Sequence, residues 1–219
     1  MSAGKILFLH GYTQSGPVFA KRSAGLRKAL GKLGFTTHYA TAPISRLVPL
    51  DAPEEERQAL FAKGFKEEDS YAWFVQDDAT GEYDGIEESW AVLKDYIAKE
   101  GPFVGVVGFS QGAVLGSMLV HEMSRLAPTQ DGFKFAVLVS GFRARCPGSD
   151  ACYPITIPTM HVMGQADSIV SNEKSQTLVD ACVEDGRKVF VHPGGHFVPS
   201  NREAVTAITG FIKQVLKMD

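Results

Sequence analysis

Residues 103–116 read FVGVVGFSQGAVLG. The apolar run Phe103–Gly108 is typical of a β-strand covered on both faces, and Ala113–Leu126 carries the apolar pattern of a helix. Between them, Gly108-Phe-Ser110-Gln-Gly112 matches the pattern Gly-x-Ser-x-Gly. This pattern indicates a tight strand-to-helix turn in which a serine adopts strained backbone angles beside glycines that have no side chain to clash. An ordinary glycine-rich turn whose serine caps the helix is the structural alternative.

The rest of the chain alternates the same two kinds of element. Further strands are expected at Lys5–Leu9, Phe35–Ala40, Phe135–Val139, Thr159–Met163 and Lys188–Val191. Helices are expected at Val18–Leu33, Ile86–Lys99, Asn172–Val183 and Arg202–Lys217. The alternation predicts an α/β fold, with a mostly parallel sheet and helices on both faces. Rossmann and flavodoxin-like folds share it, so the pattern alone indicates only the class. Because there is no internal repeat, residues 1–219 are predicted to form one domain.

Composition excludes several kinds of protein. The chain has 219 residues, 44% hydrophobic and 21% charged, as is typical of globular proteins and not of disordered or fibrous ones. A net charge of −3 argues against nucleic-acid binding. No apolar run is long enough for a membrane span or a signal-peptide core, so we expect a cytoplasmic protein, with the nucleus as the other location. Three cysteines cannot form a closed disulfide framework, which indicates a reducing compartment.

Residues 41–85 interrupt the alternation. No clean strand is expected there, and three prolines break the segment. Residues 51–88 hold 13 acidic and 3 basic side chains, a local charge of −10. A connection this long is usually a functional loop or lid, and a solvated acidic surface is the alternative. Aromatic residues in Tyr71-Ala-Trp73-Phe74 favour packing. If the segment borders a substrate pocket, it should repel anionic substrates such as acyl-CoA.

A serine hydroxyl becomes a nucleophile when an imidazole takes its proton and a carboxylate orients that imidazole. His196 follows the strand at Lys188–Val191, in a loop whose Gly-Gly pair lets the histidine reach inward. His192, at the end of the same strand, is its competitor. Because parallel strands end at one edge of a sheet, side chains that follow different strands converge there.

The carboxylate candidate is Asp167, directly after the strand at Thr159–Met163. Its structural alternative is a cap for the following helix, and Asp180 and Asp185 lie too far from the sheet edge. Ser110, Asp167 and His196 also follow the chain order found in α/β-hydrolases, which is serine, acid, histidine. The sequence therefore predicts a Ser-Asp-His triad.

Other parts of such a site are less specific. An oxyanion hole should combine the backbone N–H of Gln111 with one from the loop after the first strand, for which we choose Tyr12, with Thr13 as the alternative. Candidates for an apolar acyl pocket are Trp73, Phe74 and Phe142, each with core packing as the alternative. The sequence predicts no cofactor, because it lacks the nucleotide-binding motifs. It predicts no metal, because Cys146 and Cys152 lack a second ligand pair.

Four segments together resemble the eukaryotic, largely fungal family of serine hydrolases: LHGYTQSG at 9–16, GFSQG at 108–112, GQAD at 164–167 and GHFVP at 195–199. The similarity spans nearly the whole chain. It implies an α/β-hydrolase fold whose sheet starts at the usual third strand, with six parallel strands and no large lid. It also implies hydrolysis of carboxylic esters or thioesters through Ser110, Asp167 and His196.

The hypothesis is therefore a serine carboxylesterase that acts on a small-molecule ester through an acyl-enzyme. A thioesterase that releases an acyl or polyketide chain is the alternative within the same chemistry. A catalytically inactive hydrolase fold used as a binding protein is the alternative outside it.

Overall fold

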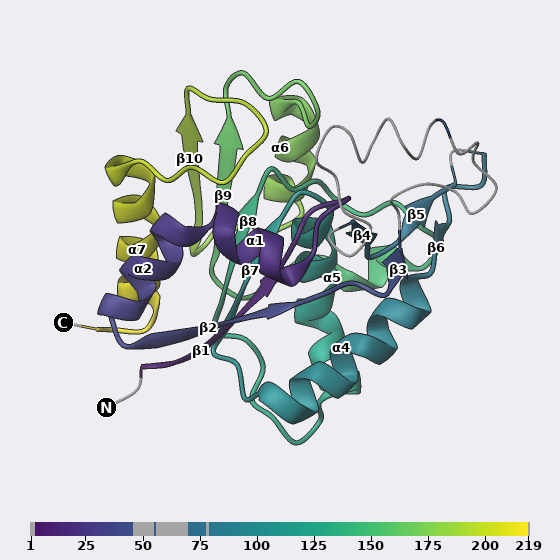
Figure 1. The fold of residues 1–219 in the computed structure, drawn as a ribbon, viewed down its shortest axis with the longest axis horizontal. Helices are drawn as coiled ribbons and strands as arrows, with labels where there is room; N and C mark the ends of the chain where they lie inside the picture. The colour runs from purple at the N-terminus through teal and green to yellow at the C-terminus, as the bar shows by residue number, and fades with distance from the viewer. Residues whose placement is uncertain (1–2, 46–54, 56–69, 78, 219) are drawn as a thin grey trace.

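The computed structural model describes residues 3–45, 55, 70–77 and 79–218, and a six-stranded parallel sheet lies at its centre (Figure 1). The strands are β1 (Gly4–Leu9), β2 (Phe35–Ala40), β7 (Gly105–Phe109), β8 (Phe135–Val139), β9 (Thr159–Gly164) and β10 (Arg187–His192). They run side by side in the order β10-β9-β8-β7-β1-β2, and every neighbouring pair is parallel. The predicted parallel sheet is thus confirmed, and β8 and β7 lie at its centre.

Helices cover both faces of the sheet, because successive strand residues point to opposite sides. In β1, Ile6 and Phe8 belong to one buried cluster, and Leu7 and Leu9 belong to the other. The first cluster packs against helices α1 (Gly16–Arg22), α2 (Ala24–Lys32) and α7 (Arg202–Val215). The second packs against α4 (Ile86–Glu100), α5 (Gln111–Leu126) and α6 (Asn172–Asp180). None of the described helices is both long and apolar enough to cross a bilayer.

One predicted helix is two helices. Val18–Leu33 was expected to be continuous, but α1 ends and α2 begins around Ser23. Ser23 is buried, and its hydroxyl donates to the Phe19 carbonyl at 2.7 Å and contacts the Tyr39 hydroxyl at 2.9 Å. Periodicity alone does not reveal this break, because the buried apolar side chains of both helices belong to the same cluster.

No clean strand was expected in residues 41–85, and the described part of this segment has four two-residue strands. β3 (Ile44–Ser45) pairs with β4 (Tyr71–Ala72), and β5 (Val75–Gln76) pairs with β6 (Tyr83–Asp84). These strands have two residues each, too short for an alternating pattern to mark them. Half of residues 51–88, which carry the −10 charge, lie outside the described residues, and so does most of the predicted lid at 41–85.

Candidate active site

Ser110 lies in the turn between β7 and α5, with φ 53° and ψ −119°. A positive φ is unfavourable for a residue with a Cβ, so packing must hold it in place. Gly112 shows how tight this packing is, since a Cβ there would lie 2.2 Å from the Leu9 carbonyl oxygen and 2.5 Å from that of His10. The strained turn predicted from the sequence is therefore present, and its glycine is required by the backbone of β1.

Three side chains from three separate loops are joined by hydrogen bonds at the carboxyl ends of the strands. His196 Nε2 lies 3.0 Å from Ser110 Oγ, and His196 Nδ1 lies 2.8 Å from Asp167 Oδ2. Because an ionised carboxylate only accepts hydrogen bonds, Nδ1 carries the ring proton and Nε2 is left to accept from the serine hydroxyl. The structure thus brings together the serine, histidine and aspartate that the sequence singled out.

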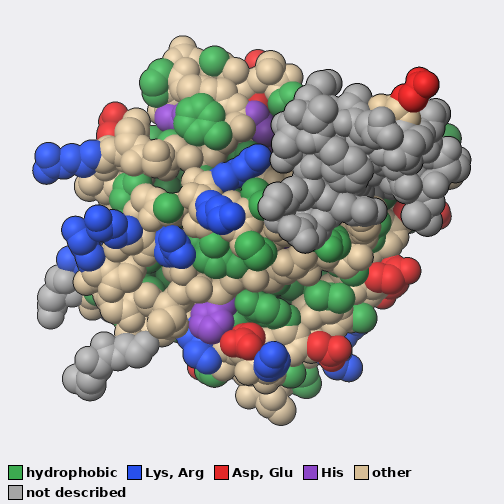
Figure 2. All heavy atoms as spheres, in the orientation of Figure 1, with side chains coloured by type: hydrophobic (Ala, Val, Ile, Leu, Met, Phe, Trp, Pro, Cys, Tyr) green, Lys and Arg blue, Asp and Glu red, His purple; other side chains and the backbone are tan. Residues whose placement is uncertain are grey.

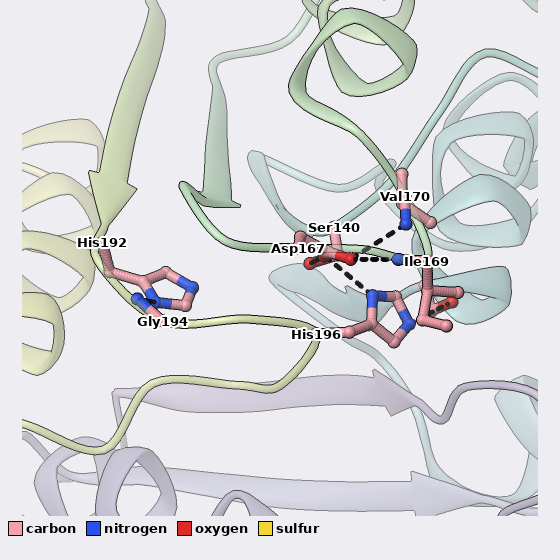
Figure 3. Close-up of polar contacts among 8 residues, drawn as sticks. Ser140, Asp167, Ile169, Val170, His192, Gly194 and His196 are labelled. Carbon is pink, nitrogen blue, oxygen red and sulfur yellow. Dashed lines mark hydrogen bonds and ion pairs between the residues drawn. The ribbon is translucent and has the colours of Figure 1, made fainter.

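Asp167 accepts more hydrogen bonds than the one from His196 (Figure 3). The backbone N–H groups of Ile169 and Val170 donate to its Oδ1 at 3.0 and 2.9 Å. The hydroxyl of Ser140 donates to its Oδ2 at 2.9 Å. Burial alone would raise the pKa of Asp167, but these hydrogen bonds outweigh it and hold the pKa below its ordinary value. The carboxylate is therefore ionised at neutral pH.

Ser140 is the residue that sequence reasoning missed. It follows β8 directly, is buried, and has a φ of 48°. Only its position in the sequence could have indicated this role. Ser140 follows a buried strand directly and precedes Gly141, so it lies at the same sheet edge as Ser110.

The two histidines of the last loop have different surroundings. His192 is buried at the end of β10, and its Nδ1 accepts a hydrogen bond from the Gly194 N–H at 3.2 Å (Figure 3). Burial lowers the pKa of His192, and the negative charge of Asp167 opposes this in part. Of the two, His196 is the one hydrogen-bonded to Ser110.

The oxyanion side is built around the start of α5. The N–H of Gln111, at the first helical position, has no acceptor within its own helix. The loop after β1 lies against Ser110, since a Cβ on Gly11 would be 3.4 Å from the Cβ of Ser110. Tyr12 and Thr13 follow in that loop, and Thr13 has a φ of 55°. Both candidate donors thus come from a segment in contact with the nucleophile turn.

His10 anchors the start of that loop. Its Nδ1 is 2.7 Å from the Gly11 carbonyl oxygen, and its Nε2 accepts from the Ala42 N–H at 3.0 Å. Burial lowers the pKa of His10 to about 4, so the ring is neutral at physiological pH.

The three predicted pocket residues do not form one pocket. Trp73 is 0% exposed, and its indole N–H donates to the His10 carbonyl at 2.9 Å. Phe74 is also buried and stacks on Tyr83 with ring centroids 4.0 Å apart. The Gln111 side chain holds both, because it accepts from the Trp73 N–H and donates to the Phe74 carbonyl, each at 2.7 Å. The backbone of Trp73 and Phe74 is therefore tied to the nucleophile turn, and both rings lie in the core.

Phe142 lies elsewhere, half-buried beside a cavity of about 340 Å³ that Arg143 and Lys174 also line. The ammonium group of Lys174 lies 3.9 Å from the centre of the Phe142 ring. This cavity is charged as well as apolar, unlike the acyl pocket that the sequence led us to expect.

A parallel sheet of this order, with a hydrogen-bonded serine, histidine and aspartate at the ends of its strands, defines the α/β-hydrolase class. The fold is shared with acyl-protein thioesterase 2 of Zea mays, at a TM-score of 0.63 and 20% identity, over 99% of this chain and 95% of that one.

The sequence relationship is more specific. The family model Serine hydrolase (FSH1) matches residues 1–208. Family of serine hydrolases 2 of Saccharomyces cerevisiae is 36% identical over 96% of this chain and 98% of its own length. Esterase OVCA2 of Danio rerio is 35% identical, over 96% of each chain. The chain belongs to the family of serine hydrolases, and this membership supports ester hydrolysis as its general activity.

Proposed function

We propose that this protein is a serine carboxylesterase that forms an acyl-enzyme on Ser110. The observation that carries the proposal is the chain of hydrogen bonds from Ser110 through His196 to Asp167, built on a strained turn. Each group has the role that its contacts allow: the hydroxyl attacks, the imidazole moves the proton, and the carboxylate orients the imidazole.

In the first step His196 Nε2 takes the hydroxyl proton as Ser110 Oγ attacks the ester carbonyl. The negative charge that develops on the carbonyl oxygen is stabilised by the N–H of Gln111 and by that of Tyr12, or of Thr13 beside it. The imidazolium then protonates the departing alcohol oxygen. Asp167 stays ionised throughout and stabilises the imidazolium through Nδ1.

In the second step a water molecule replaces the alcohol. His196 takes a proton from this water, the hydroxide attacks the acyl-enzyme carbonyl, and the bond to Ser110 Oγ breaks. The proton returns to the serine and the carboxylic acid leaves.

The surroundings of the site favour an apolar acyl group. Two large apolar side chains near it are exposed: Tyr12 by 43% and Ile169 by 68%. Tyr12 is itself the chosen oxyanion donor, and Ile169 is two residues from Asp167. Such exposed apolar side chains around a polar centre are typical of binding surfaces for apolar ligands.

A thioester would react by the same steps, with a thiol in place of the alcohol. The acyl-protein thioesterase of maize has this fold, but at 20% identity that likeness concerns the fold alone. Side-by-side rates on an oxygen ester and a thioester of one acyl chain decide between the two activities.

Labelling with a fluorophosphonate probe and turnover of p-nitrophenyl butyrate test the proposal. We expect the wild-type protein to be labelled and active. Ser110→Ala should lose labelling and about 10⁴-fold or more of kcat, as removal of a triad nucleophile does elsewhere. A wild-type protein that neither labels nor turns over would instead be a binding protein with a hydrolase fold. A Ser110→Ala protein with unchanged turnover would refute the assignment of the nucleophile.

A further inference from the structure

A cavity of about 320 Å³ opens beside the catalytic histidine, between α1 and the loop that follows β10. Its apolar walls are Phe19, Phe109, Phe197 and Val198. Its polar lining consists of Gln14, Arg22 and His196. The volume is at the lower end of the range for small-molecule sites, so it suits one part of a substrate. We call it the His196 cavity.

The chemistry of His196 indicates which part of an ester this cavity would hold. The group that leaves must lie within hydrogen-bond reach of the imidazole, because His196 Nε2 delivers its proton. The His196 cavity is lined by this histidine and not by Ser110, which forms its bond to the acyl carbon. The cavity is therefore placed for the alcohol or thiol part of the substrate.

Gln14 provides a polar group that lacks a partner. The residue is only 4% exposed, and its side-chain oxygen Oε1 is buried without a hydrogen bond to any described residue. Its backbone is held in place, since the Gln14 carbonyl accepts from the Tyr71 N–H at 2.9 Å. A buried polar atom without a partner is unfavourable, so a ligand with a polar hydrogen would be favoured there.

Arg22 provides the charge. It lies in the last turn of α1, is exposed, and makes no ion pair with another residue in the part of the chain that the structure describes. Figure 2 shows lysine and arginine side chains gathered over α1 and α2, whose basic residues are Lys21, Arg22, Arg27, Lys28 and Lys32. A guanidinium group binds carboxylates with two parallel hydrogen bonds.

We propose that the His196 cavity binds an alcohol or thiol leaving group that carries a carboxylate. The apolar middle of this group packs between the four apolar walls, the carboxylate binds Arg22, and a polar hydrogen on it faces Gln14. This inference rests on the proposed function. In the reaction the bond from the acyl carbon to Ser110 Oγ forms, the bond to the leaving oxygen or sulfur breaks, and that atom takes its proton from His196.

Two matched substrates test the inference: 4-carboxyphenyl butyrate, which is anionic, and 4-carbamoylphenyl butyrate, which has a similar shape and no charge. The measured quantity is the ratio of their kcat/KM values, so the intrinsic reactivity of each ester cancels when variants are compared. Arg22→Gln should lower this ratio about tenfold, the usual size of a charge-assisted hydrogen bond. The control is Lys21→Gln, which removes the same charge from the same helical turn but does not line the cavity. It should change the ratio less than twofold.

The outcomes separate the two proposals. If Arg22→Gln leaves the ratio unchanged, or if Lys21→Gln lowers it as much, the carboxylate site is refuted while ester hydrolysis through Ser110 stands. If the wild-type protein hydrolyses neither ester, or Ser110→Ala hydrolyses both normally, the proposed function fails and the inference fails with it. Both variants are surface substitutions, so their thermal unfolding should match that of the wild type.

Discussion

The two sides of the site are held by different forces. The elbow side, residues 10–13 and 108–112, is held by close backbone packing, as the contacts that a Cβ on Gly112 would make show. The acid–base side, made of Ser140, Asp167 and His196, is held by hydrogen bonds to the Asp167 carboxylate, from side chains and from backbone N–H groups. The elbow side depends on how closely backbone atoms can pack, and the acid–base side depends on which atoms donate and which accept hydrogen bonds. Substitutions on the two sides should therefore fail in different ways.

Backbone strain is present on both sides. Thr13, Ser110 and Ser140 have φ values of 55°, 53° and 48°, and they follow β1, β7 and β8. Each such residue costs of order 1–3 kcal/mol, so the surrounding packing must over-determine it. The strain is therefore concentrated at the edge of the sheet where the proposed chemistry takes place.

The largest effect is expected for Asp167→Asn, on the acid–base side. The asparagine oxygen can keep the hydrogen bonds from Ile169 and Val170, which leaves its NH₂ group facing His196 Nδ1. Nδ1 must then accept, so the ring proton moves to Nε2 and the imidazole cannot take the proton of Ser110. We expect kcat for p-nitrophenyl butyrate to fall about 10⁴-fold with little loss of stability.

Asp180→Asn is the control for this substitution. Asp180 accepts a hydrogen bond from Gln176 on the surface of α6, so its replacement should leave kcat within twofold of the wild type. An Asp167→Asn protein with more than a tenth of the normal kcat would mean that this carboxylate does not set the tautomer of His196.

Gly112→Ala should break the elbow side by crowding. The added methyl group would have to displace the backbone of β1, which is buried inside the sheet between β7 and β2. Because displacement of a reacting group by about 1 Å costs about 100-fold in rate, kcat should fall at least that far, with a loss of about 1–3 kcal/mol in stability. Steady-state kinetics and urea unfolding measure the two effects.

Gly116→Ala, one turn further along α5, is the matched control. A Cβ there would meet its nearest neighbour at 3.5 Å, an ordinary van der Waals distance. This variant should be fully active and no less stable than the wild type. Equal behaviour of the two variants would show that the close contact at Gly112 is relieved at no cost.

Acid should destabilise the fold through two buried histidines. Burial lowers the pKa of His10, beneath the elbow side, and of His161 in β9 to about 4 each. Their pKa in the unfolded chain is about 6.5, so between these values the unfolded state binds more protons than the folded state. The free energy of unfolding should therefore fall with decreasing pH in this window, by at most about 1.4 kcal/mol per pH unit for each histidine.

Urea unfolding at pH 7 and pH 5 measures this loss, and His161→Gln isolates one contribution. His161 contacts Thr159 and Cys182 in the core, and its replacement leaves His10 untouched. The variant should lose less stability between the two pH values than the wild type does. An equal loss in both proteins would contradict a neutral, buried His161.

The sequence predicted the parts of the molecule that depend on local patterns. Apolar runs located all six strands of the sheet, and the turn motif with its flanking strand and helix located Ser110. His196 was preferred to His192 because the Gly-Gly pair before it lets the loop fold inward. In the structure His196 is hydrogen-bonded to Ser110.

The sequence did not predict what depends on contacts between distant segments. Trp73 and Phe74 were assigned to a pocket, whereas hydrogen bonds from Gln111, nearly forty residues away, hold them in the core. The role of Gln14 and Arg22 depends on a cavity formed with the loop after β10, which no spacing along the chain reveals. Ser140 matters only because Asp167 lies opposite its hydroxyl.

Ser140 has both a strained backbone and a side-chain hydrogen bond to Asp167. Its substitutions should have the smallest effect on kcat, and they separate the two roles. Ser140→Ala and Ser140→Gly both remove the hydroxyl that donates to Asp167, so the pKa of Asp167, followed by NMR of its carboxyl carbon, should rise in both. Loss of this orienting contact should lower kcat about tenfold, the usual size of one charge-assisted hydrogen bond. Glycine also relieves the positive φ, so Ser140→Gly should be about 1 kcal/mol more stable than Ser140→Ala. If both variants lose the same activity but differ in stability, the hydroxyl positions Asp167 and the backbone carries the strain. If activity instead falls in step with stability, Ser140 serves the fold alone.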